Sequence, residues 1–266
     1  MDVKTNIVQF KNEDLYFLYL EKASEKGMTN RSWHMHSFYE MMFFTDGCSE
    51  YAIENNRYVI KKGDVLLIKP GSHHFERRVI EENASFYCLG FTSDTVECST
   101  LAEKIFEKRE HISLGCDSPL SAILSAARSI LKTSRSNAKA LMKSIAEAAI
   151  ISLDNPALIG EDDAKATTTS INKILDFINL NLFDIRSIDD IAKGVFFSNS
   201  YLRSTFKNEM GIGVMQYVRN KKILAAHRRI KNGERPTAVY AECGFANYPS
   251  FYRAYVAYCG HSPRQK

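Results

Sequence analysis

The sequence lacks the features that mark secreted, membrane-spanning and thiol-redox proteins. None of its six cysteines pairs with another in a C-x-x-C motif, so a redox motif or a cysteine-rich zinc site is unsupported. Residues 1–10 hold no apolar core of the roughly 7–15 residues that a signal peptide needs. No apolar run approaches the roughly 18 residues of a membrane span. We therefore expect a soluble, cytoplasmic protein with reduced thiols and no membrane partner.

Net charge is almost absent from the chain as a whole, but it is unevenly distributed. The 266 residues carry a formal net charge of +4, and their 45% hydrophobic and 25% charged composition excludes a disordered or fibrous chain. From residue 169 onward, 15 Lys and Arg stand against 7 Asp and Glu, a net charge of +8. The preceding residues hold 20 against 24, a net charge of −4. A basic module beside an acidic one is the electrostatic footprint of phosphate binding, so we expect the last third to bind nucleic acid.

Strand patterns dominate residues 33–91. The apolar and aromatic run 38–44 is expected to stop at Asp46-Gly47, and residues 51–60 are typical of a hairpin with a polar turn. The buried run 65–68 is expected to end before the Pro-Gly pair that follows it. Short strands at this spacing predict a small β-barrel or sandwich.

The apolar period becomes helical between residues 101 and 153. Two helices joined near residues 133–137 are expected there. Their apolar stripes consist of Ile123, Ala126, Ala127 and Ile130 in the first and Leu141, Ile145, Ala148 and Ala149 in the second. These stripes either pack on the barrel or form a dimer interface, and we expect a homodimer. Residues 154–169 lose the pattern and are typical of a linker between a domain of residues 1–153 and one of residues 170–266.

The last domain is expected to be all-helical and to contain an internal repeat. Ser187 and Ser198 are placed to cap two of its helices. Leu202 and Phe251, Phe206 and Tyr255, and Gly211 and Gly260 form pairs with a constant offset of 49 residues. A short helix, a tight turn and a capped second helix make a helix-turn-helix, which is therefore predicted twice. The helix expected at 213–231 would be about 28 Å long. It would place the two recognition helices roughly one DNA turn apart, about 34 Å.

The motifs of this domain resemble those of one regulator family. The matching stretches are residues 187–192 (SIDDIA), 198–207 (SNSYLRSTFK), 210–211 (MG), 243–253 (CGFANYPSFYR) and 260–263 (GHSP). They are similar to the AraC/XylS family of bacterial transcription regulators. The resemblance implies a protein that is not an enzyme and more often activates than represses. It implies promoter DNA, a small-molecule effector and RNA polymerase as partners. Tyr240 stands where the family pattern usually has a small alanine.

Each predicted recognition helix has an apolar side and a polar side. In the first, Tyr201, Leu202 and Phe206 should face the core. The residues expected to face DNA are Asn199, Ser200, Arg203, Ser204 and Lys207 in the first helix and Asn247, Tyr248, Pro249, Tyr252 and Arg253 in the second. Arg203 is the best candidate for a bidentate contact to guanine, and Lys207 is expected to meet phosphate. For every one of these residues, a solvated side chain is the alternative.

Histidines gather in the N-terminal part. His34-x-His36 followed by Glu40 resembles the first cupin motif, and a Gly-Asp, a Pro-Gly and then His74 resemble the second. The overall expectation is therefore an α+β protein: an N-terminal cupin-like β-barrel with a helical dimerisation region, and a C-terminal double helix-turn-helix. Alternate residues of a strand face one side, so His34, His36 and Glu40 can point into the barrel together. His74 would enter from the facing strand.

Three interpretations of these four residues stay open. Imidazoles and a carboxylate are a normal ligand set for a divalent metal such as Zn, Fe, Ni or Mn. They can equally bind an organic effector, with a sugar as the leading candidate by resemblance. They can also form structural hydrogen bonds only. A metal-dependent cupin enzyme, such as an isomerase or dioxygenase fused to a DNA-binding module, is the alternative function, and an architectural DNA-binding protein without a ligand is a third.

Overall fold

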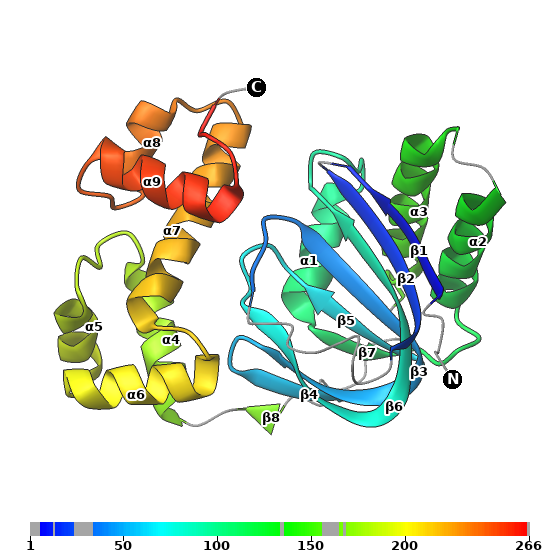
Figure 1. The fold of residues 1–266 in the computed structure, drawn as a ribbon, viewed down its shortest axis with the longest axis horizontal. Helices are drawn as coiled ribbons and strands as arrows, with labels where there is room; N and C mark the ends of the chain where they lie inside the picture. The colour runs from blue at the N-terminus through cyan, green and yellow to red at the C-terminus, as the bar shows by residue number, and fades with distance from the viewer. Residues whose placement is uncertain are drawn as a thin grey trace. The chain divides into compact units, whose positions relative to one another are not determined.

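A computed structural model describes residues 6–12, 14–23, 34–133, 136–155, 165–166 and 169–264. The chain divides into two compact units, Met1–Lys165 and Ala166–Lys266. The first is built around a sheet and the second from helices alone, apart from one residue of a short strand (Figure 1). The predicted α+β architecture with two domains is confirmed. Much of the predicted linker, residues 156–164 and 167–168, lies outside the described residues, so its exact bounds stay a prediction.

Among the described residues, the sheet has eight strands, the last of which ends one residue inside the second unit. They are β1 (Asn6–Lys11), β2 (Leu15–Ala23), β3 (Tyr39–Ile53), β4 (Asn56–Ile60), β5 (Asp64–Ile68), β6 (His74–Phe91), β7 (His111–Ser113) and β8 (Lys165–Ala166). Their order is β1-β2-β6-β3-β4-β8, and β5 pairs with both β3 and β7. The long strands β3 and β6 curl the sheet around an apolar interior, and we call this part the barrel (Figure 1). Strands β1 and β2 precede the region in which strands were expected.

The predicted strand end at Asp46-Gly47 is wrong, whereas the hairpin that follows is confirmed. Strand β3 continues past Gly47, and its register with β6 shifts between Phe44 and Ser49. Gly47 has φ of +82°, and a Cβ there would lie 2.6 Å from the Cα of Ala84. The glycine therefore marks a bulge that bends a continuing strand. Further on, a tight turn connects β3 to β4, and Ile53 is paired with Asn56.

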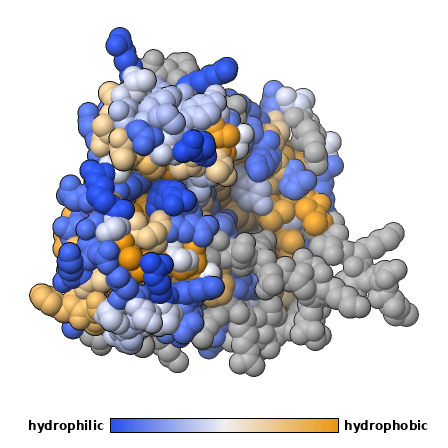
Figure 2. All heavy atoms as spheres, turned by 60° about the vertical axis from the view of Figure 1, so that its left-hand side comes forward, coloured by the Kyte–Doolittle hydropathy of each residue, from blue (hydrophilic) through white to orange (hydrophobic). Residues whose placement is uncertain are grey.

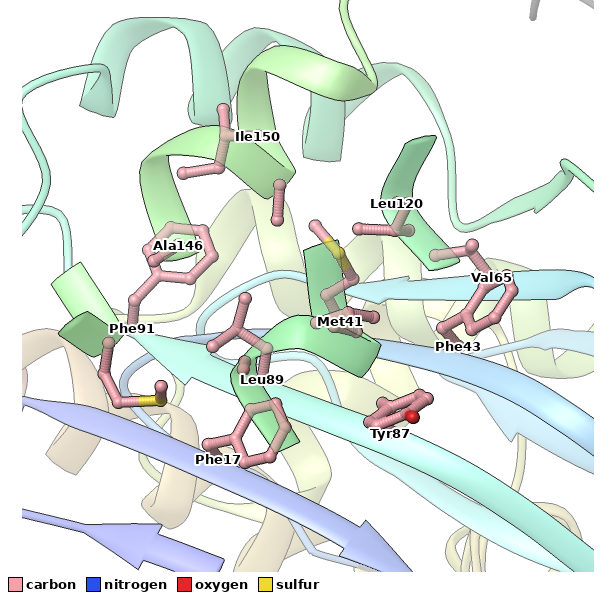
Figure 3. Packing of buried hydrophobic residues seen from close by; sticks show 14 of the residues in the cluster. Phe17, Met41, Phe43, Val65, Tyr87, Leu89, Phe91, Leu120, Ala146 and Ile150 are labelled. Atoms are coloured by element: carbon pink, nitrogen blue, oxygen red, sulfur yellow. The ribbon is translucent and has the colours of Figure 1, made fainter. Parts of the chain in front are cut away.

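The two faces of the curled sheet have separate cores. Met42 and Phe44 of β3 lie in a cluster inside the barrel, and the alternate residues Met41 and Phe43 lie in a second cluster with the helices. Figure 3 shows the second cluster, in which the strand residues face helical residues such as Ala146. Because both faces are buried there, residues 41–44 of β3 are all apolar instead of alternating with polar residues.

In the described part of the first unit, three helices accompany the sheet: α1 (Ser99–Lys108), α2 (Pro119–Thr133) and α3 (Ala138–Ser152). The two predicted helices and the joint between them are confirmed by α2 and α3, which pack against each other and contact β1 and β2. Of the two alternatives left open for the apolar stripe of α2, packing on the barrel does not hold for most of its residues, and the dimer interface stays a prediction. The buried residues of α2 are Leu120, Leu124, Ala127 and Leu131. Ile130, which belongs to the predicted stripe, is 42% exposed. The helix carries two adjacent apolar faces, and the spacing alone does not say which one packs on the sheet.

The second unit consists of six helices among the described residues. They are α4 (Thr169–Asn181), α5 (Ile188–Val195), α6 (Asn199–Met210), α7 (Val214–Lys231), α8 (Pro236–Glu242) and α9 (Tyr248–Cys259). Helix α7 runs between the pair α5–α6 at one end and the pair α8–α9 at the other (Figure 1). Its 18 residues span about 27 Å. Within the part of the chain that the structure describes, no helix has both the length and the apolar character of a membrane span.

Candidate nucleic-acid interface and histidine site

The sequence repeat is also a structural repeat. The Ser198 Oγ accepts a hydrogen bond from the Tyr201 backbone N–H at 3.2 Å, and 49 residues later the Asn247 Oδ1 accepts one from the Ser250 N–H at 2.9 Å. Each cap starts a helix of 12 residues that ends at a glycine in the left-handed conformation. The predicted cap at Ser187 is present too, as a capping box with Asp190. The chain therefore contains two helix-turn-helix motifs, α5–α6 and α8–α9.

Helix α6 buries Leu202 and Phe206, as the repeat requires. All five residues expected to face DNA on this helix are exposed: Asn199, Ser200, Arg203, Ser204 and Lys207. The expectation that Tyr201 faces the core is wrong. Its side chain is 46% exposed, and its hydroxyl donates to the Ser170 Oγ of α4 at 3.1 Å. The phenol hydroxyl has a polar partner on a neighbouring helix. The spacing of apolar residues along α6 does not predict such a partner.

Helix α9 buries Phe251 and Tyr255 in the same way. Of the residues expected to face DNA here, four are exposed: Asn247, Pro249, Tyr252 and Arg253. The fifth, Tyr248, is half-buried, and its ring packs edge-on against Tyr240 with centroids 5.7 Å apart. The tyrosine at position 240, where the family pattern has a small residue, therefore covers part of the surface at the start of α9.

The net positive charge of this unit does not all reach its surface. Hydrophilic residues predominate on the face of the helical unit seen in Figure 2. The guanidinium of Arg229 is paired with Glu234 and Glu242, so it is already neutralised. Lys222, in the middle of α7, is only 5% exposed. A lysine on a basic helix is ordinarily solvated, and Lys222 departs from that pattern.

Lys222 joins the two helix-turn-helix motifs from the inside. Its Nζ donates to the Ile185 carbonyl oxygen, just before α5, at 2.6 Å and to the Gly244 carbonyl oxygen, in the turn before α9, at 3.1 Å. Arg186 donates to the same Gly244 oxygen. Burial, together with the nearby Arg186 cation, lowers the pKa of Lys222 to about 8. Sequence reasoning missed this role because a lysine on a basic helix has no local signature of burial.

Backbone pairing brings the predicted histidines to one end of the barrel. The N–H groups of His34 and His74 each donate to the carbonyl oxygen of the other, at 3.1 and 3.0 Å, and the Gly71 N–H donates to the His36 carbonyl oxygen at 2.8 Å. Residues 34–36 therefore lie beside the start of β6, and Glu40 is the second residue of β3. One donor atom from each of His34, His36, Glu40 and His74 lies within 4.8 Å of the others.

The carboxylate of Glu40 is the centre of this group. Its Oε2 lies 3.0 Å from the His36 Nε2 and 3.2 Å from the His74 Nε2. The Cys88 Sγ donates to the other oxygen, Oε1, at 2.8 Å. Burial by itself would raise the pKa of Glu40, but the two imidazoles hold that pKa well below its usual range. Cys88 was missed from the sequence, although its place on β6 directly opposite Met42 points it into the barrel.

The other ring nitrogens of the two imidazoles that face Glu40 are hydrogen-bonded to backbone. The His36 Nδ1 lies 2.9 Å from the Phe38 carbonyl oxygen, and the His74 Nδ1 lies 2.9 Å from the Ser72 carbonyl oxygen. A carbonyl oxygen only accepts, so both Nδ1 atoms carry a proton and both Nε2 atoms face Glu40. The ring of Phe38 stacks on His36 with centroids 3.8 Å apart. His34 is exposed and forms the open side of the group.

Two family models match the chain. One is described as an AraC-like ligand binding domain and matches residues 19–150, and the other as a helix-turn-helix domain and matches residues 191–266. The chain belongs to the AraC family. It is therefore a DNA-binding transcription regulator with a ligand-binding domain, and the two units described above correspond to these two parts.

Similar proteins are regulators too. The chain is 29% identical over 103 residues to the probable transcriptional regulator LumQ of Photobacterium leiognathi. The aligned stretch covers 38% of this chain and 42% of LumQ. The match therefore spans less than half of LumQ. It is 21% identical over 231 residues to the Msm operon regulatory protein of Streptococcus mutans, covering 85% of this chain and 82% of that protein. The crystal structure of ToxT from Vibrio cholerae O395 aligns over 98% of this chain and 95% of its own, with 15% identity and a TM-score of 0.39.

Proposed function

We propose that this AraC-family regulator reads promoter DNA with α6 and α9 and activates transcription when a small polar effector binds in the barrel. The observation that supports the proposal best is the repeat of two capped 12-residue helices with exposed polar faces. Two such helices at opposite ends of α7 suit two successive major grooves on one face of a duplex. RNA polymerase is the partner that activation requires, and the bacterial cytoplasm is the compartment where both partners meet.

The exposed faces of the two helices differ in the contacts that they offer to DNA. Arg203 and Arg253 have the fork of donors that matches the guanine edge, so they are the proposed base-reading residues. Lys207 is the proposed phosphate contact, which fixes position without reading sequence. The remaining contacts are assigned to the smaller polar and aromatic side chains: Asn199, Ser200, Ser204, Asn247, Tyr248, Pro249 and Tyr252. Because the Asn247 Oδ1 caps α9, the side-chain amide nitrogen is the atom proposed to contact DNA, as a donor.

The effector is proposed to bind at His34, His36, Glu40 and His74. This end of the barrel offers imidazole and carboxylate groups beside the stacked ring of Phe38. Hydroxyl groups of a sugar can donate to a carboxylate and accept from an imidazole, so a sugar is the first effector to test.

The regulator is proposed to be a homodimer that associates through the outer faces of α2 and α3. Ile130 on α2 is 42% exposed and Ile151 on α3 is 60% exposed. These two helices pack against each other, and their exposed isoleucines would be covered by the same pair of helices of a second copy. An isologous interface of this kind uses one surface twice.

A binding titration with the promoter upstream of the regulator's own gene tests this proposal. The affinity should fall steeply with salt, because each neutralised phosphate releases counterions and contributes about −0.9 to the slope of log K against log salt. A reporter fused to that promoter should then respond to the effector in cells with the wild-type chain. A flat salt dependence contradicts the DNA-reading surface, and a reporter that falls when the effector is added contradicts activation.

A further inference from the structure

We propose that Lys222 is a positioning residue that sets the spacing and register at which the two recognition helices, α6 and α9, meet DNA. This inference rests on the proposed function, in which both helices read one duplex, and it adds what holds the two helices in step. The chain then selects DNA by the distance between two half-sites as well as by their bases. The hydrogen bonds of this buried cation, and the turns that it joins, carry the inference.

Each helix-turn-helix motif packs on one part of α7 (Figure 1). In the first motif, the ring of Phe206 on α6 packs against Tyr217 of α7 with centroids 5.2 Å apart. In the second, α8 and α9 share a buried cluster with Ile223, Ala226 and Ile230 of α7. Apolar contacts are non-directional, whereas hydrogen bonds prefer a narrow range of distance and angle. A hydrogen-bonded junction between the motifs therefore restricts their relative orientation more sharply than apolar packing does.

Such a junction lies beside the middle of α7. The Lys222 Nζ donates to the Ile185 carbonyl oxygen at 2.6 Å and to the Gly244 carbonyl oxygen at 3.1 Å. The guanidinium of Arg186 donates to the same Gly244 oxygen. Gly244 has φ of +76°, and a Cβ on it would clash with the Phe183 carbonyl oxygen. The backbone that precedes α9 therefore touches the backbone that leads into α5.

Both backbone segments of this junction belong to turns that are held by further hydrogen bonds. Asp190 accepts from the N–H groups of Arg186 and Ser187, both at 2.8 Å, in the capping box that starts α5. On the other side, the Gly244 N–H donates to a carbonyl oxygen of α8 at 2.9 Å. Gly244 lies three residues before Asn247, the cap of α9. A displacement at the junction therefore moves the start of α9 relative to the first motif.

The charge of Lys222 strengthens the junction. The side chain is 5% exposed, and burial together with the Arg186 cation lowers its pKa to about 8. Below that pH the ammonium group is charged, and a charge-assisted hydrogen bond is roughly twice as strong as a neutral one. Methionine at this position has a similar length and no donor. Of the three hydrogen bonds described above, only the one from Arg186 to Gly244 then remains.

The geometry of DNA turns a fixed orientation into a basis for selection. Successive major grooves on one face of the duplex lie about 10–10.5 base pairs apart. One base pair inserted between two half-sites moves the second by about 3.4 Å and turns it by about 34° around the duplex axis. A rigid pair of recognition helices cannot follow both changes, whereas a loosely joined pair follows them in part.

The test uses the full-length chain and DNA duplexes that the wild type selects from a random-sequence pool. Hydroxyl-radical footprinting locates the two protected segments about one turn apart, and one base pair is then inserted or removed between them. Each change should weaken wild-type binding about tenfold or more, because even one mismatched base pair costs about 5–150-fold. Lys222→Met should lose most of this spacing penalty.

The spacing penalty is a ratio of two affinities of the same protein, so a general loss of folded protein cancels. Lys221→Met, which removes the neighbouring cation on α7, is the matched control and should keep the wild-type penalty whatever its absolute affinity. Urea titrations at the assay temperature check that each variant is folded. Should Lys222→Met not fold, Arg186→Gln takes its place, because it removes the second donor to Gly244 from an exposed position.

The outcomes separate this inference from the proposed function. A wild type that tolerates the changed spacing overturns the inference. Equal penalties in the wild type and in the junction variant overturn it too, as does the same loss in Lys221→Met. A wild type that selects no duplexes, or only duplexes with a single protected segment, contradicts the reading of DNA by both helices and hence the proposed function.

Discussion

The ammonium group of Lys222 donates a hydrogen bond to the carbonyl oxygen of Gly244 at 3.1 Å. Its second bond, to the Ile185 carbonyl oxygen, connects the entry of the first helix-turn-helix to the turn of the second. Gly244 has φ of +76°, and a Cβ on it would clash with the Phe183 carbonyl oxygen. The two motifs therefore approach each other closely around one buried cation on α7, which is hydrogen-bonded to both of them.

Replacing this lysine should destabilise the helical unit. In Lys222→Met the Ile185 carbonyl oxygen loses its 2.6 Å hydrogen bond, and an unsatisfied buried carbonyl costs about 1–3 kcal/mol. The free energy of unfolding in urea measures the loss. Lys221→Met, which removes the neighbouring charge on α7 without touching these carbonyls, should stay within about 0.5 kcal/mol of the wild type. Equal effects of the two substitutions would contradict the bridge.

The same lysine should make stability depend on pH. Burial lowers its pKa to about 8 in the folded chain, whereas the unfolded chain keeps the proton up to about pH 10.4. Between these values the unfolded state binds more protons, so the contribution of Lys222 to the free energy of unfolding rises with pH. The stability difference between the wild type and Lys222→Met should therefore grow between pH 8 and 10. A constant difference would show that Lys222 does not titrate in this range.

The sequence predicts the helical unit better than the barrel. Its helices depend on interactions between residues that are close in the sequence, such as the caps at Ser187, Ser198 and Asn247. The offset of 49 residues between Leu202 and Phe251 likewise repeats a local pattern. The spatial meeting of His36, Glu40 and His74 could be predicted only because the cupin resemblance supplied it. The composition of the sequence does not indicate that residues as far apart as His36 and His74 lie close together in space.

What sequence reasoning missed depends on long-range packing. Gly47 looked like the end of a strand, and only its contact with Ala84 on the neighbouring strand shows it to be a bend. Lys222 looked like a solvated cation, and only the carbonyl groups of two distant turns account for its burial. The apolar stripe of α2 that includes Ile130 could pack on the barrel or form a dimer interface, and only the packing of the helix shows that its other apolar face is the buried one.

The left-handed conformation of Phe196 should cost stability. This residue ends α5 with φ of 60°, and its side chain is 93% exposed. An L-residue in this region pays about 1–2 kcal/mol, and glycine avoids that strain at a smaller cost in unfolded-state entropy. Phe196→Gly should therefore be about 1 kcal/mol more stable than Phe196→Ala, which loses the same ring and keeps the strain. Thermal unfolding of both variants decides it, and an alanine variant as stable as the glycine variant would contradict the strain.

The proposed dimer interface can be broken at a residue that does not belong to the core. Ile151 is 60% exposed on α3, so Ile151→Asp should leave folding intact. In an interface the new carboxylate would be buried without a partner, which is strongly unfavourable. Light scattering after size exclusion should show a shift from dimer to monomer. Leu180→Asp, at an 85% exposed position on α4, should not change the mass. A dimer that survives Ile151→Asp places the interface elsewhere.

The loss of Arg203 and the loss of Lys207 should change DNA binding in different ways. Both side chains are exposed on α6, one turn apart, so neither substitution disturbs the core formed by Leu202 and Phe206. A bidentate arginine is worth about 1–3 kcal/mol for one base pair, whereas a phosphate contact adds affinity for every sequence. Arg203→Ala should therefore lower the affinity for the promoter site and relax the preference at one position. Lys207→Ala should weaken all sequences alike and reduce the salt slope by about one. Binding to a set of singly substituted sites at several salt concentrations measures both effects, and a uniform loss in Arg203→Ala would reassign Arg203 to the phosphate backbone.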